Sequence, residues 1–99
     1  MGHTPTNVIV NRDTSDSSIE ASFTLNSRHV VRYQREGQFI QHLYLYVDES
    51  EISNATTAFL TYISWPFTID RVDCVFTFSL LGTRASGKLE VGGTIVFTI

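Results

Sequence analysis

The sequence predicts an all-β fold, an antiparallel β-sandwich or a jelly-roll-like barrel of about seven short strands. Apolar and polar residues alternate over several segments, which is the period of a strand with one buried face. Turn residues separate these segments at intervals of about 8–12 residues, as in sandwiches and barrels. No segment has a helical period, which argues against an α-helical or α/β fold.

The chain of 99 residues is long enough for one domain. Residues 1–17 contain Thr, Asn, Asp and Ser around the patch Val8-Ile9-Val10, so we expect a loosely ordered lead-in with room for one edge strand. A single β-sandwich domain is expected over residues 18–99. Its first strand is predicted at Ile19–Leu25, where four apolar residues share one face: Ile19, Ala21, Phe23 and Leu25.

A hairpin is predicted next. Val30–Arg35 forms one strand, Glu36-Gly37 supplies the positive φ that tight loops need, and Phe39–Val47 runs back antiparallel. The returning strand has apolar or aromatic side chains on both faces, Leu43, Leu45 and Val47 on one and Ile40, Tyr44 and Tyr46 on the other. Both faces therefore need cover.

The segment Asp48–Thr57 is polar and acidic, and we expect an exposed loop there. Ala58–Ser64 is predicted to be a strand that ends before Pro66, because the proline ring removes a ladder donor and keeps the preceding residue extended. The strongest strand is predicted at Val72–Leu80, at the centre of the core, with five alternating apolar positions: Val72, Cys74, Phe76, Phe78 and Leu80.

Two turns and two short strands are predicted to complete the domain. Gly82–Gly87 and Gly92-Gly93 are the turns, Lys88–Val91 is the first strand and Thr94–Ile99 is the last. On the last strand we expect three residues to point inward: Ile95, Phe97 and Ile99.

The amino-acid composition indicates which kinds of partner the chain can bind. The chain is 42% hydrophobic and 17% charged, against ~25% charged in an average domain, so part of its apolar surface is expected to meet another subunit. The net charge of -3 and the 7 scattered basic residues argue against nucleic acid, which needs clustered Lys and Arg. No apolar run approaches the roughly 18 residues of a membrane span, so no membrane insertion is expected.

The sequence offers no recognisable set of catalytic or metal-binding residues. The histidines His3, His29 and His42 lack the spacing of a zinc pair. Cys74 is the sole cysteine and has apolar neighbours, so we expect a buried thiol that acts as a small hydrophobe. We predict no enzymatic activity, no cofactor and no metal.

The acidic residues Asp48, Glu49 and Glu51 have the oxygen ligands that calcium prefers, but the glycine and the ligand periodicity of a calcium loop are missing. A solvated loop is the better interpretation, and the same holds for Asp13 and Asp16.

The segment Val31–Phe67 has a characteristic order. Tyr33, Arg35 and Gly37 open it, a long alternating strand and a polar loop follow, and the run Ile63-Ser64-Trp65-Pro66-Phe67 closes it. This order resembles the terminal domains of bacteriophage tail fibres and related virion appendages, whose closing strand ends in Leu-Pro-Phe. Trp65 stands where that family usually carries leucine. The resemblance covers about a third of the chain.

The resemblance implies a structural or attachment role in the virion. It also implies a homotrimer that contacts other virion proteins, a host surface receptor or a glycan. Rigid β scaffolds generally bind through loops, and aromatic rings with a polar group suit both sugars and protein interfaces. We therefore predict a binding site at Asp48, Glu49 and Glu51, flanked by Tyr44 and Tyr46.

Three functions stay open at this point. The first is a phage virion structural protein, such as a fibre head, a spike or a capsid decoration domain. The second is a carbohydrate-binding module or lectin-like domain, which the same aromatic residues favour. The third is a small inhibitor of a host protein.

Overall fold

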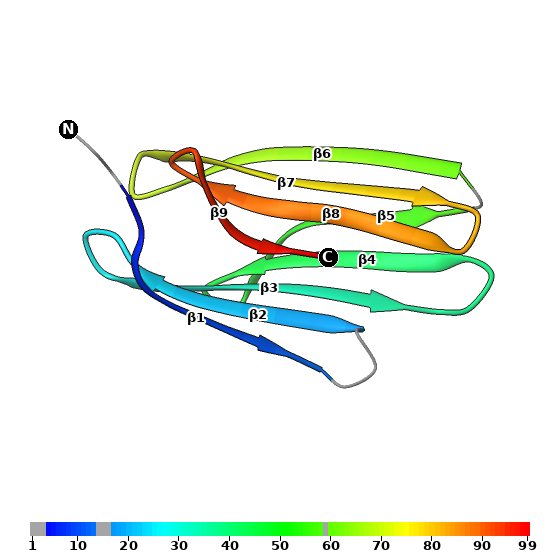
Figure 1. Cartoon of the computed structure of the whole chain (residues 1–99), viewed down its shortest axis with the longest axis horizontal. Coiled ribbons are helices and arrows are strands. Elements are labelled where there is room, and N and C mark those ends of the chain that lie inside the picture. Colours follow the sequence, from blue (N-terminus) through cyan, green and yellow to red (C-terminus); the bar gives the residue numbers. More distant parts are fainter. Residues whose placement is uncertain (1–3, 14–16, 59) are drawn as a thin grey trace.

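The computed structural model describes residues 4–13, 17–58 and 60–99, which form strands joined by short connections (Figure 1). The strands are β1 (Thr6–Arg12), β2 (Ser18–Thr24), β3 (Arg28–Glu36), β4 (Gln41–Val47), β5 (Ser50–Thr57), β6 (Leu60–Ile69), β7 (Val72–Leu81), β8 (Arg84–Val91) and β9 (Thr94–Thr98).

The strands form two antiparallel sheets that pack face to face (Figure 1). We call β1–β5 the N-terminal sheet and β6–β9 the C-terminal sheet; in each, spatial order equals chain order. The predicted antiparallel β-sandwich is confirmed, with nine strands in the described residues rather than about seven. Each sheet is an up-and-down meander, so the strands do not interleave between sheets as they do in a jelly roll.

The core lies between the sheets, where every second side chain points inward. The alternating positions predicted for the central strand are all buried in β7. Phe76 contacts aromatic rings of both sheets: its centroid lies 5.3 Å from that of Tyr33 in the opposite sheet and 5.8 Å from that of Trp65, its cross-strand partner in β6. Full burial of one such side chain contributes about 1.5–3 kcal/mol, so this layer is the main source of stability.

The prediction of an exposed loop over Asp48–Thr57 is wrong. β5 pairs with β4 from Ser50 to Thr57, interrupted by one bulge. The turn is confined to Asp48 and Glu49, whose φ values are 50° and 70°. Two successive positive φ angles are those of a type I′ turn, which matches the twist of the paired strands. The polar composition of this segment reflects an edge strand with one face in solvent.

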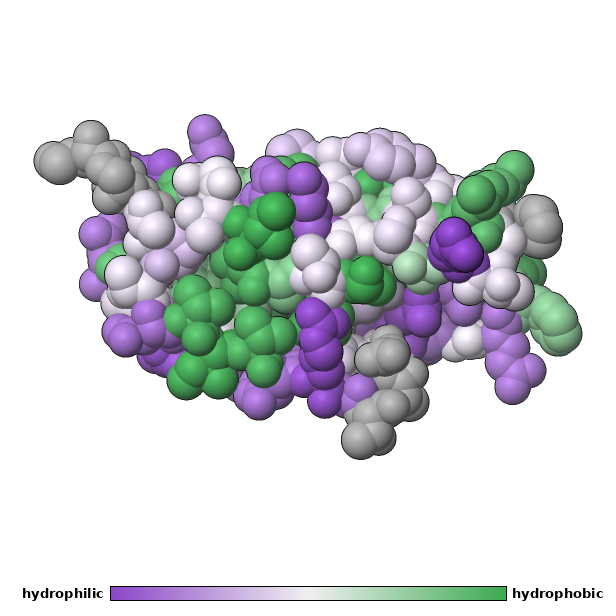
Figure 2. All heavy atoms as spheres, viewed as in Figure 1, coloured by the Kyte–Doolittle hydropathy of each residue, from purple (hydrophilic) through white to green (hydrophobic). Residues whose placement is uncertain are grey.

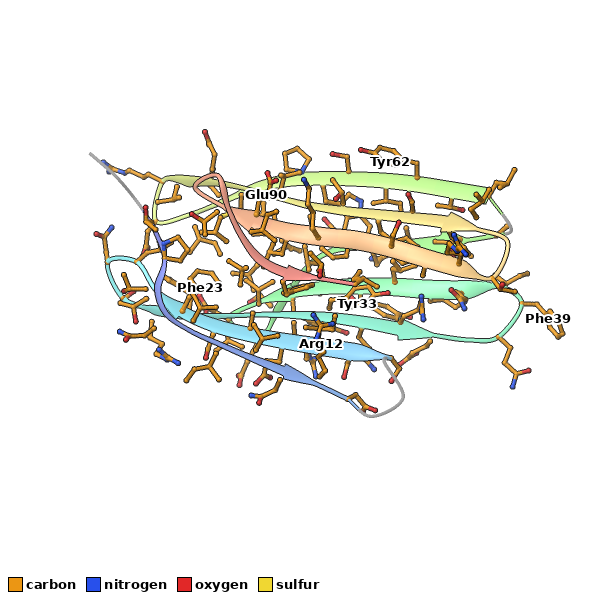
Figure 3. All side chains as sticks on the ribbon, in the orientation of Figure 1. Arg12, Phe23, Tyr33, Phe39, Tyr62 and Glu90 are labelled. Atoms are coloured by element: carbon orange, nitrogen blue, oxygen red, sulfur yellow. The ribbon has the colours of Figure 1, made fainter. Side chains whose placement is uncertain are left out.

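The turn at Gly37 is confirmed, with a φ of 102° and no room for a Cβ beside the Ile40 carbonyl oxygen. The strand predicted to begin at Phe39 begins instead at Gln41. Phe39 belongs to the β3–β4 loop, where it projects beyond the strands with 92% of its surface exposed (Figure 3).

The strand predicted to end before Pro66 continues to Ile69. Pro66 is in β6 and lies opposite Val75 of β7. β6 is an edge strand, so it is hydrogen-bonded to another strand on one side only. Proline is tolerated at an edge because its missing N–H can face solvent. Of the predicted span Ala58–Ser64, residue 59 lies outside the described residues.

The predicted turn Gly82–Gly87 is too long, because β8 already begins at Arg84. Gly87 lies within β8, opposite Phe78, where a Cβ would collide with the Thr77 carbonyl oxygen. This glycine therefore permits close packing of two strands rather than a turn.

The inward face predicted for the last strand is partly wrong. Ile95 is 52% exposed, whereas the consecutive residues Val96 and Phe97 are both buried. A bulge between Leu89 and Glu90 shifts the pairing of β8 with β9, so the simple alternation fails there. Ile99 is half-buried and packs against the core.

The predicted edge strand at Val8–Val10 is present as β1. It pairs with β2 in the N-terminal sheet, so regular structure begins inside the expected lead-in. At the seam between the sheets, Arg12 Nη2 donates a hydrogen bond of 2.6 Å to the Thr98 carbonyl oxygen of β9. Apolar residues gather over β1 and β9 on this side of the molecule (Figure 2), where Val8, Ile9 and Ile95 are exposed.

Candidate functional site

The outer face of the N-terminal sheet places a row of aromatic and charged side chains side by side. Strand pairing aligns Glu20 of β2 with Arg32 of β3, and Arg32 with Tyr46 of β4. Because side chains alternate between faces, these residues share the face opposite to the core. The next row contains Tyr44, with Gln34 and Asn54 as its cross-strand neighbours.

The aromatic residues of this face are ordered by one another and by a cation. The rings of Tyr44 and Tyr46 are stacked, with centroids 6.3 Å apart and planes 27° apart. The Arg32 guanidinium carbon lies 4.3 Å from the centroid of the Tyr46 ring, within cation–π range. Arg32 covers one face of Tyr46, so the tyrosine offers its edge and its hydroxyl to a ligand.

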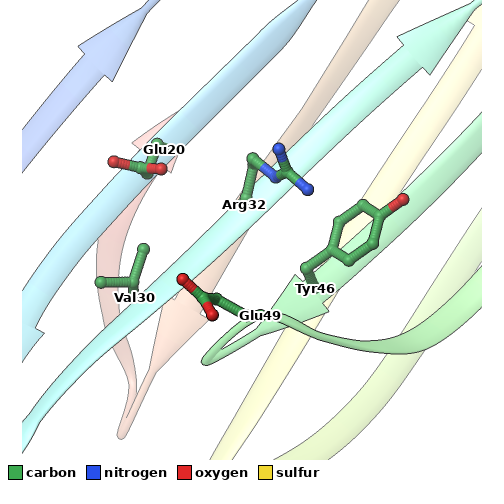
Figure 4. A pocket seen from close by; sticks show the side chains of 5 residues that line it. All are labelled: Glu20, Val30, Arg32, Tyr46 and Glu49. Carbon is green, nitrogen blue, oxygen red and sulfur yellow. The ribbon is translucent and has the colours of Figure 1, made fainter.

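A shallow hollow of ≈ 290 Å³ opens beside this row, and Figure 4 shows the side chains that line it: Glu20, Val30, Arg32, Tyr46 and Glu49. Arg32 supplies only hydrogen-bond donors, the two carboxylates only acceptors, and the Tyr46 hydroxyl both. Val30 adds a small apolar floor. Groups that donate and accept around an aromatic ring suit a ligand rich in hydroxyl groups.

The structure divides the predicted acidic site between three environments. Glu49 lines the hollow together with Tyr46. Glu51 accepts a hydrogen bond of 3.0 Å from Asn54 Nδ2. Asp48 lines a second, adjacent hollow with Glu20, Val30 and Glu49, and its carboxylate is bonded to His29. Of the predicted residues, Tyr46 and Glu49 thus come together, Tyr44 lies one row away, and Arg32 and Glu20 were missed.

A charged cluster lies at the end of the sandwich where β3 begins, and we call it the His29 clamp. His29 Nδ1 lies 2.6 Å from Asp48 Oδ2, and its Nε2 lies 2.6 Å from Asp70 Oδ2. Asp48 belongs to the β4–β5 turn and Asp70 to the β6–β7 turn, so the clamp joins the two sheets. Asp48 Oδ1 also accepts the Val30 backbone N–H at 2.9 Å.

The clamp perturbs the pKa values of its members. Burial lowers the pKa of His29, but hydrogen bonds to Asp48 and Asp70 and the charges of both carboxylates outweigh burial and raise it. Burial likewise raises the pKa of Asp48, yet the bonds from His29 and the Val30 N–H bring it below its usual value. Because each ring nitrogen lies against a carboxylate oxygen, the clamp favours the protonated imidazole.

Ser27, His29 and Asp48 have the connectivity of a hydrolase triad, since Ser27 Oγ lies 3.2 Å from His29 Nε2. A general base needs a free lone pair on the nitrogen that faces the nucleophile. Here Asp70 Oδ2 accepts a hydrogen bond from Nε2–H at 2.6 Å, and Asp48 Oδ2 accepts one from Nδ1–H at the same distance. An imidazole that donates from both nitrogens cannot accept the serine proton, so this geometry favours a structural role.

The other sequence candidates lie apart from the hollow. His42 is exposed and hydrogen-bonds Thr56 Oγ1 at 3.1 Å. Cys74 is buried as predicted, and burial, with the nearby Asp73 charge, raises the pKa of its thiol to about 11 against an opposing backbone hydrogen bond. Asp13 bonds the Ser18 carbonyl oxygen through its backbone N–H. His3 and Asp16 lie outside the described residues.

Within residues 4–13, 17–58 and 60–99, no group of three or more His, Cys, Asp and Glu side chains is arranged to hold a metal ion. The same residues include no helix with the length and hydrophobicity needed to cross a membrane. Comparison of the chain with protein-family models, curated proteins and solved structures finds no match. The resemblance to virion appendages therefore stays a prediction.

Proposed function

We propose that this chain is a recognition domain of a phage virion appendage that binds a saccharide on the host surface without catalysis. Its binding surface is the outer face of the N-terminal sheet, at the hollow beside Tyr44 and Tyr46. The observation that carries the proposal is the combination, in one hollow, of a tyrosine edge, a guanidinium and two carboxylates. The resemblance of Val31–Phe67 to appendage domains supports the virion assignment.

The surface has the properties that saccharide binding requires. Sugars present many hydroxyl groups, each of which donates and accepts, over a ring with apolar C–H faces. Arg32 and Glu20, aligned by strand pairing, can bond adjacent hydroxyls, while the stacked tyrosines provide amphipathic contact area. All of these groups project from paired strands, so little conformational entropy is lost when a ligand binds.

Binding to arrayed bacterial surface polysaccharides tests this function. The double variant Tyr44→Ala/Tyr46→Ala should lose at least about tenfold in affinity, which corresponds to about 1.4 kcal/mol. Tyr62→Ala is the matched control, because Tyr62 is 71% exposed on the other sheet. Wild-type protein that binds no polysaccharide, or a double variant that binds as tightly as the control, contradicts the proposal.

The homotrimer is part of the same proposal. The exposed apolar side chains over β1 and β9 are the kind of surface that a neighbouring copy covers around a symmetry axis. Multi-angle light scattering should give the mass of a trimer at micromolar concentration. A monomer that still binds polysaccharide would instead identify a free-standing lectin-like module, the second candidate. Immunogold labelling of particles whose genome encodes the chain distinguishes the two by location.

A further inference from the structure

The inner face of β3 carries a cation at each end. His29, Val31, Tyr33 and Arg35 alternate along this face, because their partners on β2 and β4 are the buried residues Phe23, Ala21, Ile19 and Leu43. His29 is bonded to two carboxylates. Arg35, at the opposite end, has no carboxylate within ion-pairing distance among the described residues. Arg35 is half-buried, so its guanidinium is partly hydrated and can accept an anionic partner.

Arg35 borders a cavity of ≈ 570 Å³ at this end of the sandwich. The other lining residues come from the β3–β4 loop and from β4, and from the end of β7 and the β7–β8 turn: Gln38, Phe39, Gln41, Leu80, Gly82 and Thr83. The cavity therefore opens between the two sheets. Its volume is within the range of about 300–1,000 Å³ that is typical of small-molecule sites.

Incompletely paired polar atoms occur on Gln41, which lines this cavity, and on residues next to its lining in the strands. Gln41 Oε1 is buried and accepts no hydrogen bond from the described residues. Thr57, its direct cross-strand neighbour, is 1% exposed, and its hydroxyl is equally unpaired. The Tyr33 hydroxyl is also buried, and Arg35 is its neighbour: burial raises the pKa of Tyr33 to about 12, while the charge of Arg35 and a hydrogen bond from its side chain offset part of the shift. Each buried unpaired group costs about 1–3 kcal/mol, so polar groups are less completely satisfied at this end of the sandwich than at the His29 end.

The surface around the cavity mouth is apolar. Phe39 in the β3–β4 loop, Leu60 at the start of β6 and Leu81 at the end of β7 are 92%, 65% and 68% exposed. Figure 2 shows apolar side chains at this end of the molecule, and Figure 3 labels Phe39 there. The described part of the chain thus presents an apolar rim around a cationic interior.

We propose that this cavity binds a small amphipathic carboxylic acid, with its carboxylate on Arg35 and its aliphatic or aromatic body against Phe39 and Leu80. The planar guanidinium matches a carboxylate with two parallel hydrogen bonds, so it selects this head group over an alcohol. The apolar side chains that line the cavity, Phe39 and Leu80, accept the body. The site is separate from the hollow on the outer face, because the two have no lining residue in common.

Titration calorimetry with octanoate, below its micelle-forming concentration, tests the site. Wild-type protein should bind one octanoate per chain in a saturable manner. Octanol has the same alkyl body without the charge and should bind at least about tenfold more weakly, because a hydrogen bond to a charged group is worth about 1.5–3 kcal/mol. Backbone amide shifts in an NMR titration should change in residues 35–43 and 80–84.

Two pairs of variants separate charge from apolar contact. Arg35→Gln should weaken octanoate binding about tenfold and bring it close to that of octanol, whereas the exposed Arg71→Gln, in the β6–β7 turn, should leave it unchanged. Phe39→Ser should weaken both ligands, whereas Leu81→Ser, at the same end but outside the cavity lining, should weaken neither. The denaturation midpoint of each variant shows whether it is folded.

Several results would overturn the proposal. They are a lack of saturable binding, equal affinity for octanoate and octanol, and an Arg35→Gln variant that binds like Arg71→Gln. Shift changes confined to the outer sheet face would also overturn it. So would a mass in light scattering that rises with concentration, falls on Phe39→Ser and is insensitive to octanoate, because that result would assign this end to a second copy of the chain.

Discussion

The two ends of the sandwich differ in whether the basic residue on the inner face of β3 is paired with carboxylates. At the His29 end, a cation on the inner face of β3 meets one carboxylate from each sheet at 2.6 Å. At the Arg35 end, a cation on the same face lines a cavity of ≈ 570 Å³, with unpaired polar atoms on the neighbouring Gln41 and Thr57. One end is therefore closed by charge pairing, and the other is open.

The difference shows that position in a strand does not decide the role of a buried polar residue. His29 and Arg35 have the same phase in the same strand, and the turns that reach them differ. Two tight turns bring Asp48 and Asp70 to His29. The β3–β4 loop and the β7–β8 turn bring Phe39 and Gly82 near Arg35. The two carboxylates make His29 a link between the sheets, whereas Arg35, which has no carboxylate partner among the described residues, is available to a ligand.

The largest expected contrast comes from one substitution made at both ends. Phe23 is fully buried near His29, with ring centroids 6.4 Å apart, and Phe23→Ala should cost about 3–5 kcal/mol of unfolding free energy. Phe39→Ala should change it by less than about 0.5 kcal/mol, because the ring is exposed. Urea denaturation measures both. Similar losses for the two variants would show that the Arg35 end is packed in solution.

The next contrast concerns the clamp itself. Asp70→Asn keeps the shape of the side chain but removes its charge, and it should cost about 1–2 kcal/mol, since the bond is charge-assisted and partly exposed. Asp73→Asn, on the exposed face of β7, is the control and should change little. If both variants unfold at the same urea concentration, the clamp does not hold the sheets together.

The pH dependence of stability should identify the protonated state of His29. Its pKa is raised above 6.5, so its contribution is complete below that value and is lost as pH rises through the folded pKa. The lowered pKa of Asp48 acts in the other direction: its contribution is present above 3.8 and is lost as pH falls through the folded pKa.

Urea midpoints measured from pH 5 to pH 9 should therefore fall on the alkaline side in wild-type protein and fall less in His29→Gln. Equal alkaline slopes in the two proteins would show that the fall has another origin.

The smallest expected effect has the opposite sign. At the Arg35 end, Thr57→Val removes a buried hydroxyl that has no partner among the described residues, and it should stabilise the fold by up to about 1 kcal/mol. Thr68→Val on the exposed face of β6 is the control. A marked loss of stability in Thr57→Val alone would mean that the hydroxyl is bonded in solution, and the contrast between the ends would weaken.

Simple alternation was enough to predict the fold class and the buried face of β7. Alternation did not predict the β4–β5 turn, because that turn contains none of the glycines by which such turns are usually recognised. Asp48 and Glu49 form a type I′ turn without the glycine that usually signals it, so the acidic strand that follows was interpreted as a loop. Pro66 is compatible with a strand only because β6 is at an edge, and edge position is a property of the assembled sheet.

The candidate site was predictable in part. The spacing of Tyr44 and Tyr46 places both rings on one face, but their partner Arg32 comes from the preceding strand, and only the register of the hairpin aligns them. His29 and Asp70 are separated by 41 positions in the chain. No local pattern links such residues, because their contact depends on how one sheet packs on the other.

The meander topology has a consequence for how two copies of the chain can combine. Residues 6–57 supply one complete sheet and residues 60–98 the other, and the chain crosses between them once. Every ladder is thus closed within its own half. Two molecules that exchange their C-terminal halves would keep each strand pair and the whole inter-sheet core, and only the link from β5 to β6 would differ. That single link is therefore the point at which a chain pairs its two sheets within itself or with a second copy.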